Sequence, residues 1–475
     1  MSMRNMIVRL KSVTLKNIKN VANGKVDMPG AGRTDESSVL GIYGQNGSGK
    51  TAVIDALEFL QKIIWGERIN KAYSELIKSD TNDASIALEL TLFEGKKRCD
   101  LEYVVAFEKN TDLGIIITQE TLYKKSENDA RKINFITYKR ADKSSIFTPD
   151  THLAEILEGN PDLEMELLVA KKLAEKDNCS YIFGDSSREL FNAVMNNTNN
   201  PYYEYARFIM ILWRFSIDDL FVITDTHSGM ISAKVILPMA FRLENGSGMR
   251  AKGSFVVPMT GPAELLDEEY TVLQNILEEI NTVLYTIIPG LEIGIKNYGP
   301  RLRDDGQKVN RFELTSVRDG GTPIPIRMES EGIIKIISVL NALIHAYGDP
   351  SICVAIDELD AGVFEYMLGE LLDIFHQGAK GQLIFTSHNL RALEMLEVEN
   401  VVFSTTNEKK RYVHMTNIRD TNNFRNAYIR AITLGGQSES LYSKTDSLKI
   451  ARAFRKAGRK IRSSDGGKES CSGCR

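Results

Sequence analysis

The chain has 475 residues, 43% of them hydrophobic and 26% charged, which is typical of a globular protein with two or three cores and excludes a disordered or fibrous chain. The formal net charge of -4 excludes a global attraction to nucleic acid, so such a contact would need a local basic patch. Five cysteines, an odd number, argue against a disulfide framework, and no apolar run approaches the roughly 18 residues of a membrane span. We therefore expect a cytoplasmic protein without a membrane segment.

The first third of the chain predicts strands around one amphipathic helix. Residues 7–20 alternate apolar and polar side chains, and residues 37–43 form a short apolar run that breaks into glycines, so both are expected to be strands. Four further strand-like runs lie between Ser85 and Tyr138, separated by charged or glycine-bearing turns, and predict an antiparallel lobe. The helix after the glycines should bury one broad face, made by Ala52, Val53, Ala56, Leu57, Leu60, Ile63 and Ile64.

The middle of the chain gives mixed signals. Residues 150–215 read as helices with a polar break at NNTNNPYY, residues 196–203. Strand-like runs follow at 220–224 and 233–241, and a helix is expected from Pro262 to Ile288. Its acidic residues lie mostly off the apolar stripe, which indicates a solvated face rather than a metal site.

The segment Gly44–Thr51 fits the phosphate-loop pattern G-x-x-x-x-G-K-[ST] between a predicted strand and a predicted helix. Its backbone N–H groups can close around a β-phosphate, Lys50 can neutralise the β and γ oxygens, and the Thr51 hydroxyl is placed to bind Mg²⁺. The expected nucleotide-binding residues are Asn46, Gly47, Ser48, Gly49, Lys50 and Thr51.

Two later strands carry polar residues at their ends. The apolar run SICVAI ends in Asp357, which can hold the Mg²⁺ water shell, and Glu358 follows where a group that polarises attacking water is expected. The next buried strand, after one helix expected at 363–377, ends in Ser387 and His388. Because strand ends in this kind of sheet face the nucleotide, we expect His388 to act at the site.

Ser330 and Gly332 begin a helix just ahead of the Asp-Glu strand. A serine hydroxyl and a glycine N–H at a helix N-terminus can form a second anion site, but a simple serine N-cap explains the spacing equally well. The expected buried face of this helix comprises Ile333, Ile336, Ile337, Leu340 and Leu343.

The order of these four motifs resembles the ABC-type ATPase heads of the SMC, RecF and OLD group, and most of all the AAA-type ATPases of bacterial anti-phage and abortive-infection systems. The resemblance covers residues 7–65 and 325–437. It implies an α/β fold, a P-loop ATPase head with an antiparallel β-lobe and an inserted, mostly helical lobe.

The resemblance also implies roles. Lys50 and Thr51 would form Walker A, Asp357 and Glu358 Walker B, and His388 the switch histidine. ESEG at 329–332 would be a degenerate signature whose Ser330 meets the γ-phosphate bound to a second subunit. The expected site is thus catalytic Glu358 and His388, metal-binding Thr51 and Asp357, D-loop Asp360, and Ser330 and Gly332 acting in trans, with ATP and Mg²⁺ bound between two head-to-tail copies.

The chain departs from the family at two points. No glutamine occurs between Gln119 and Gln274, so the Q-loop role is unassigned, with Gln119 a weak candidate. The signature lacks the double glycine of transporter ATPases. The 278 residues between Thr51 and Ser330 (330 minus 51 minus 1) are too few for SMC-type arms, and the 87 residues after His388 (475 minus 388) contain no convincing nuclease constellation.

The tail is basic. DSLKIARAFRKAGRKIR, from Asp446, predicts an amphipathic helix with Leu448, Ile450, Ala451 and Phe454 near one side, suited either to solvent or to docking and nucleic-acid contact. The lone C-x-x-C pair, Cys471 and Cys474, does not indicate zinc.

The expected division is 1–145 for the first half of the head with the β-lobe, 146–300 for an inserted lobe, 301–440 for the second half, and 441–475 for the tail. The expected function is an ATP-hydrolysing switch, the sensor or regulatory ATPase of an anti-phage system that acts with a separately encoded effector, such as a nuclease. A RecF-like DNA-binding repair ATPase and an ATP-dependent scaffold without required turnover are the alternatives, and DNA or RNA contact stays open.

Overall fold

The fold is defined by a computed structural model. The predicted break at 196–203 lies almost wholly outside the residues it describes, and so do Cys471 and Cys474. The described residues are 6–34, 36–127, 131–149, 151, 161–195, 203–224, 229–231, 233–244, 250–303, 305–416, 424–435, 437–442 and 446–465.

A six-stranded sheet forms the centre of the molecule, in the order β18-β17-β3-β16-β15-β8. Its neighbours pair in parallel except for the edge strand β18. Every residue of β3, β15, β16 and β17 is buried, as expected for parallel strands covered on both faces. The bounds are β3 (Ser38–Tyr43), β8 (Leu220–Ile223), β15 (Cys353–Ile356), β16 (Gln382–Ser387), β17 (Val401–Ser404) and β18 (Tyr412–Val413).

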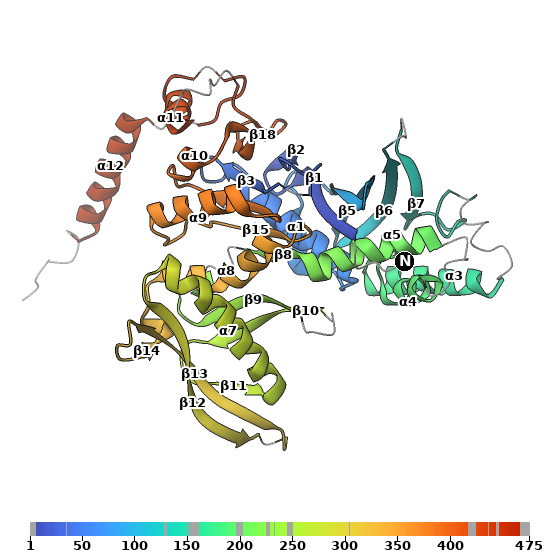
Figure 1. Ribbon diagram of the computed structural model, residues 1–475. Helices are drawn as coiled ribbons and strands as arrows, with labels where there is room; N and C mark the ends of the chain where they lie inside the picture. Colours follow the sequence, from blue (N-terminus) through green and yellow to red (C-terminus); the bar gives the residue numbers. More distant parts are fainter. Residues whose placement is uncertain are drawn as a thin grey trace, which may run out of the picture.

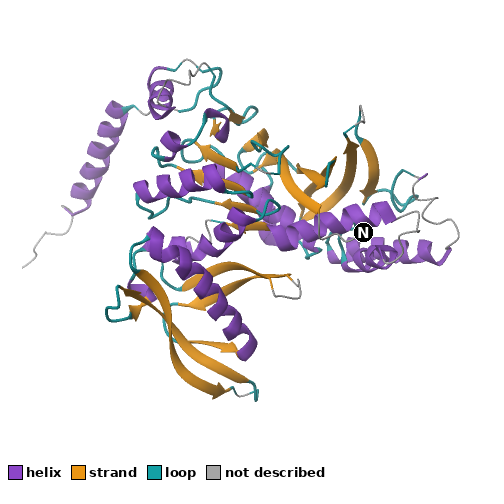
Figure 2. Ribbon diagram, viewed as in Figure 1, coloured by secondary structure: helices purple, strands orange, loops and turns teal. Residues whose placement is uncertain are grey.

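Helices cover both faces of this sheet (Figures 1 and 2). Leu40 and Ile42 of β3 pack with the helix α1 (Lys50–Trp65), whereas Val39 and Tyr43 point into a second core with α8 (Glu331–Gly348) and α9 (Glu365–Gly378). The apolar face predicted for α1 is confirmed. The face predicted for α8 is buried except for Ile333, which is half-buried. Further residues of α8 are also buried, around most of the helix circumference.

A second six-stranded sheet is antiparallel, in the order β2-β1-β4-β5-β6-β7. The four predicted runs are confirmed, and the N-terminal strand joins this sheet rather than the central one. Besides α1, three helices share its core. The bounds are β1 (Met6–Ile18), β2 (Val21–Asp27), β4 (Asp83–Glu94), β5 (Lys97–Asn110), β6 (Gly114–Ser126), β7 (Ile133–Lys139), α3 (Pro161–Asp177), α4 (Asp185–Met195) and α5 (Tyr203–Arg214), with a 3₁₀ helix at Lys71–Leu76 and a π-helix at Phe215–Asp219.

A third unit lies below the central sheet in Figure 1. Its helix α7 begins at Asp267 and not at Pro262, because Ala263–Leu266 pair with β13 as the strand β11. The boundary expected at residue 300 falls inside β12, which pairs with β13 along its length. The bounds are β9 (Ile236–Glu244), β10 (Arg250–Pro258), β11 (Ala263–Leu266), α7 (Asp267–Ile287), β12 (Leu291–Leu302), β13 (Lys308–Arg318), β14 (Ile324–Pro325) and a 3₁₀ helix at Ile326–Met328.

Gln382 joins the two large sheets. Its buried amide accepts from the N–H of Leu10 at 2.6 Å and donates to the Leu10 carbonyl at 2.8 Å. Leu10 stands at a β-bulge, where the register of β1 against β4 shifts and leaves backbone groups unpaired. The amide therefore holds the antiparallel sheet against the strand that ends at His388.

The C-terminal part consists of α10 (Ala392–Met395), a 3₁₀ helix (Val398–Asn400), α11 (Phe424–Leu434) and α12 (Ser447–Asp465). The tail helix is confirmed, and it projects away from the body in Figure 1. Among the described helices, none combines the length and the apolar content needed to cross a bilayer.

Candidate functional site

The parallel strands β3, β16 and β15 end side by side, which brings together segments more than 300 residues apart. Ser38 pairs with Gln382, and Gln382 pairs with Cys353, so the three carboxyl ends meet at one edge. Ligands of open parallel sheets bind at this edge. The predicted phosphate loop, the Asp-Glu pair and the histidine therefore share one site.

The phosphate loop is held in a shape that only glycine allows. Gly44 has φ +153° and Gly49 φ +94°, and a Cβ at Gly49 would meet Asn20 Oδ1 at 2.9 Å. At Gly44 a Cβ would overlap the side chain of Ser404, which also hydrogen-bonds Ser48 Oγ and donates to the Tyr43 carbonyl at 3.0 Å. The end of β17 thus braces the loop.

Lys50 folds back over the loop as the first residue of α1. Its Nζ donates to the carbonyls of Gly44 at 3.0 Å and Gln45 at 3.2 Å, and the side chain is buried. Burial lowers the pKa of Lys50, and the carboxylates of Asp357, Glu358 and Asp360 oppose this only in part. A lysine that exchanges two carbonyls for phosphate oxygens gains a charge-assisted contact.

Asp357 is fully buried at the end of β15. Its Oδ1 accepts from Thr386 Oγ1 at 2.5 Å and from Thr51 Oγ1 at 3.3 Å. Its Oδ2 is buried and has no hydrogen-bond partner within the described part of the chain. A buried carboxylate oxygen without a partner is costly, and together with the Thr51 hydroxyl it is the oxygen donor set that suits Mg²⁺. These residues fit the metal.

Glu358 adopts a strained backbone conformation, with φ +48° in the left-handed region that residues other than glycine rarely occupy. The conformation is fixed from β16, because the N–H of Glu358 donates to Thr386 Oγ1 at 2.8 Å and the N–H of Leu359 to the Thr386 carbonyl at 3.1 Å. Strain of this kind, costing about 1–2 kcal/mol, is characteristic of functional positions.

Asp360 and His388 lie together. The backbone N–H of His388 donates to Asp360 Oδ2 at 3.0 Å, which ties the predicted D-loop to the predicted switch. His388 as a whole is exposed, but its imidazole is partly desolvated. This desolvation and the nearby charge of Lys50 lower the pKa of His388, whereas the charges of Asp360 and Asp357 act to raise it. The ring is therefore neutral near pH 7 and can donate one hydrogen bond.

Ser330 is exposed and caps α8, since its hydroxyl oxygen accepts a hydrogen bond from the N–H of Ile333 at 3.4 Å. A cap and an anion contact in trans can coexist at an exposed hydroxyl. Gly332 is buried against the same chain, where a Cβ would overlap the carbonyl oxygen of Gly362. Its smallness thus serves close packing of the predicted signature on the predicted D-loop.

Glu329 anchors the signature from beneath and was not found by sequence reasoning. It accepts from Arg318 at 2.8 and 2.7 Å and from Ser316 Oγ at 2.6 Å, while Lys234 donates to its carbonyl at 3.0 Å. Burial opposes the shift, but Arg318 and Ser316 hold the pKa of Glu329 below its ordinary value. Only its place beside Ser330 could have marked it.

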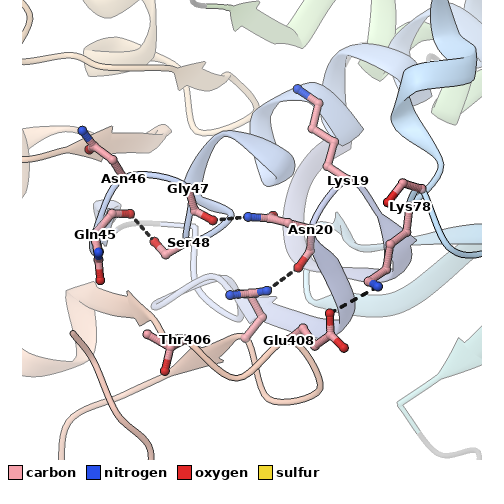
Figure 3. Close-up of a pocket in the computed structure, with 11 residues that line it drawn as sticks. Lys19, Asn20, Gln45, Asn46, Gly47, Ser48, Lys78, Thr406 and Glu408 are labelled. Atoms are coloured by element: carbon pink, nitrogen blue, oxygen red, sulfur yellow. Dashed lines mark hydrogen bonds and ion pairs between the residues drawn. The ribbon is translucent and has the colours of Figure 1, made fainter. Parts of the chain in front are cut away.

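A polar cavity of about 410 Å³ opens beside the phosphate loop (Figure 3). Lys19 and Asn20 line it from the β1–β2 turn, Lys78 lines it from the segment before β4, and Arg411 lines it from the position just before β18. Asn20 hydrogen-bonds the Gly47 carbonyl and Arg411 the Asn20 carbonyl. Because Lys19, Lys78 and Arg411 come from separate segments, no local sequence pattern predicts that they line one cavity.

Gln119, the weak Q-loop candidate, lies inside β6 and donates to Thr121 Oγ1 at 3.1 Å. The strand next to β15 at the site is instead β8, which ends at Ile223. Residues 225–228, which follow it, lie outside the described residues, and the Q-loop role stays unassigned.

Comparisons with known proteins found a matching family model and similar solved structures. Residues 12–192 match the family model described as AAA domain. Solved structures with similar folds include an Smc head domain from Pyrococcus furiosus bound to the C-terminal domain of ScpA (13% identity, 86% of this chain, 96% of that chain, TM-score 0.39) and the SMC head domain from Thermotoga maritima (13%, 86%, 100%, 0.38). Similarity this low establishes no shared activity. A search of curated proteins gave no significant match.

Proposed function

We propose that this chain, a P-loop ATPase head of the ABC type with an AAA domain, is a nucleotide-driven switch in which two copies sandwich ATP head to tail and hydrolyse it. The nucleotide phosphates would bind the backbone of residues 46–51 and Lys50, with the base and ribose toward the polar cavity beside the loop.

One observation carries the proposal: the buried Oδ2 of Asp357, without a partner among the described residues, beside the Thr51 hydroxyl and the folded-back Lys50. Asp357 and Thr51 would hold Mg²⁺, which supplies charge neutralisation on the phosphate oxygens. In a purely structural aspartate, a buried carboxylate oxygen is normally hydrogen-bonded.

Hydrolysis is assigned to the residues after the two strands. Glu358, half-buried and fixed by Thr386, would orient and polarise the attacking water, and neutral His388 would donate a hydrogen bond to the γ-phosphate. Asp360 positions His388 through its backbone.

The sandwich is supported by the surface around the signature. Met328, two residues before exposed Ser330, and Phe364, two residues after Gly362, are each 67% exposed. Large apolar side chains exposed next to an incomplete anion site suit an interface with a second copy.

Glu358→Gln tests the proposal. It should lower turnover at least a hundredfold while preserving ATP binding, and ATP should raise the dimer fraction in light scattering because hydrolysis no longer separates the two heads. Lys50→Ala, the matched control, should abolish ATP binding and with it the ATP-dependent increase in the dimer fraction. A Glu358→Gln protein that turns over ATP normally would refute the assigned chemistry.

The biological role we propose is that of a sensor or regulatory ATPase of an anti-phage system in the cytoplasm, acting with a separately encoded effector such as a nuclease. The compact lobes in place of long arms support it. Full defence by Glu358→Gln would favour a scaffold instead, and turnover raised several-fold by duplex DNA in a salt-sensitive way would favour a RecF-like repair ATPase. A neighbouring gene that encodes a nuclease would favour the defence role.

A further inference from the structure

The tail helix α12 exposes an apolar stripe that no other described part of its chain covers. Ile450, Ala453, Phe454 and Ala457 follow the spacing i, i+3, i+4, i+7 of one helix face. Phe454 is 76% exposed and Ile450 44%. A free amphipathic helix gains little stability in water from propensity alone, so such a stripe calls for a docking surface.

The charge of α12 is strongly positive. Its sequence contains seven lysines and arginines and one acidic residue, Asp465. Lys449, Arg452, Arg455 and Lys456 all lie off the apolar stripe. The surface that receives α12 must therefore be apolar at its floor and acidic at its rim.

The chain carries a groove of that description between α7, α8 and α9. It has a volume of about 430 Å³ and is lined by Val283, Leu343, Tyr347, Leu371 and Ile374, among others. Ile374 is 58% exposed and Tyr347 43%. The floor is apolar, and the side chains at its mouth are open to solvent in the single chain.

The rim of the groove is acidic. Neither α7 nor α9 contains a lysine or arginine, whereas α7 has five acidic residues and α9 has three. Exposed Glu370 lines the groove itself, and exposed Glu278 precedes Thr282, another lining residue, by one turn. The sign and placement of this charge match the flanks of α12.

We propose that α12 of one copy docks in the α7–α8–α9 groove of a second copy. Within the described residues of one chain, both the stripe and the groove stay exposed. In a pair of copies related by a two-fold axis, each copy's α12 would cover the groove of the other, so that both stripes and both grooves are buried. At 19 residues, α12 is roughly 28 Å long, enough to span the 14-residue α9 beside it.

This contact goes beyond the ATP sandwich, because none of its residues belongs to the nucleotide site. It holds two copies together without nucleotide, so that ATP closes a pair already formed. Lys50→Ala should therefore keep the nucleotide-free dimer, which separates failure of this proposal from failure of the proposed function.

Light scattering of the nucleotide-free full chain provides the first test. Phe454→Asp and Ile374→Asp should each weaken the dimer at least tenfold. Leu448→Asp is the matched control. Leu448 was expected near the same side as Ile450, but at 100° per residue it lies on the opposite side of the helix, where it is 67% exposed, so its replacement should leave the dimer unchanged. Equal effects of Leu448→Asp and Phe454→Asp, or a wild type that is monomeric at micromolar concentration, would overturn the proposal.

Cross-linking identifies the occupant. With Cys471 and Cys474 replaced by serine, a Phe454→Cys chain mixed with an Ile374→Cys chain should form a disulfide-linked pair that neither forms alone. If a disulfide forms only within one chain that carries both Phe454→Cys and Ile374→Cys, α12 docks in the groove of its own chain. If Phe454→Asp leaves the mass unchanged and weakens binding to a 20-base-pair duplex, the helix is a nucleic-acid contact; either outcome refutes the proposal.

Discussion

The hydroxyl of Thr386 donates a 2.5 Å hydrogen bond to Oδ1 of Asp357, the carboxylate whose other oxygen has no partner among the described residues. The same hydroxyl accepts from the N–H of Glu358 at 2.8 Å. One buried side chain on β16 therefore holds both acidic residues that follow β15 in position. Because β16 also leads into His388, this one strand fixes the positions of all three groups.

Thr386→Val removes this hydroxyl at constant volume. We expect ATP binding to survive and kcat to fall at least tenfold, since Glu358 loses its support; stability should fall by about 1 kcal/mol. Steady-state kinetics and thermal unfolding measure the two effects. Thr386→Ser keeps the hydroxyl and should recover most of kcat, and failure to do so would mean that the methyl group matters more.

Alkaline pH should weaken ATP binding earlier than an ordinary lysine would allow. Burial lowers the pKa of Lys50, and only the protonated form attracts phosphate, so affinity is present at low pH and is lost as pH rises through that lowered pKa. Calorimetric titrations between pH 7 and pH 10 would detect the decline. Binding should also take up protons at the alkaline end, and an affinity independent of pH would contradict the assignment.

Gly332→Ala should destabilise the protein by about 3 kcal/mol, because its Cβ would overlap a backbone oxygen of Gly362 that cannot move aside. ATPase activity should fall with it as the signature is displaced. Gly348→Ala, in the last turn of the same helix, meets no atom within 4 Å and serves as the control. Urea unfolding compares the two, and equal midpoints would argue against the close packing.

The ion pair between Arg318 and Glu329 should stabilise the fold in a pH-dependent way. The pKa of Glu329 is below its ordinary 4.5 in the folded chain, so this stability is present above 4.5 and is lost as pH falls through the lowered pKa. Arg318→Ala should cost about 2 kcal/mol at pH 7 and less at pH 3. Urea unfolding at both pH values checks this, and a cost that does not change with pH would exclude the ion pair as its source.

The elements and the phosphate loop could be predicted because their signals are local. Apolar periodicity marks α1, and the glycines and Lys50 stand within eight residues. The acidic pair and His388 follow buried apolar strands, and their meeting follows from parallel topology.

What escaped prediction depends on partners far along the chain. Ala263–Leu266 look helical until their pairing with β13 is known. The sequence of β1 predicts a strand, but it does not indicate which sheet the strand joins. Thr386 is an ordinary strand threonine until Asp357 is beside it. Lys19, Lys78 and Arg411 meet only through folding.

The central sheet also dictates when during synthesis the site can exist. Ser38 in β3 pairs with Gln382, 344 residues later, so β3 and the apolar face of α1 leave the ribosome long before the strands that cover them. The antiparallel sheet, whose strands are near neighbours in sequence, can form first and shelter part of that surface. A chain truncated before β16 would therefore lack the site and expose the apolar strand meant for its centre, a ready template for aggregation.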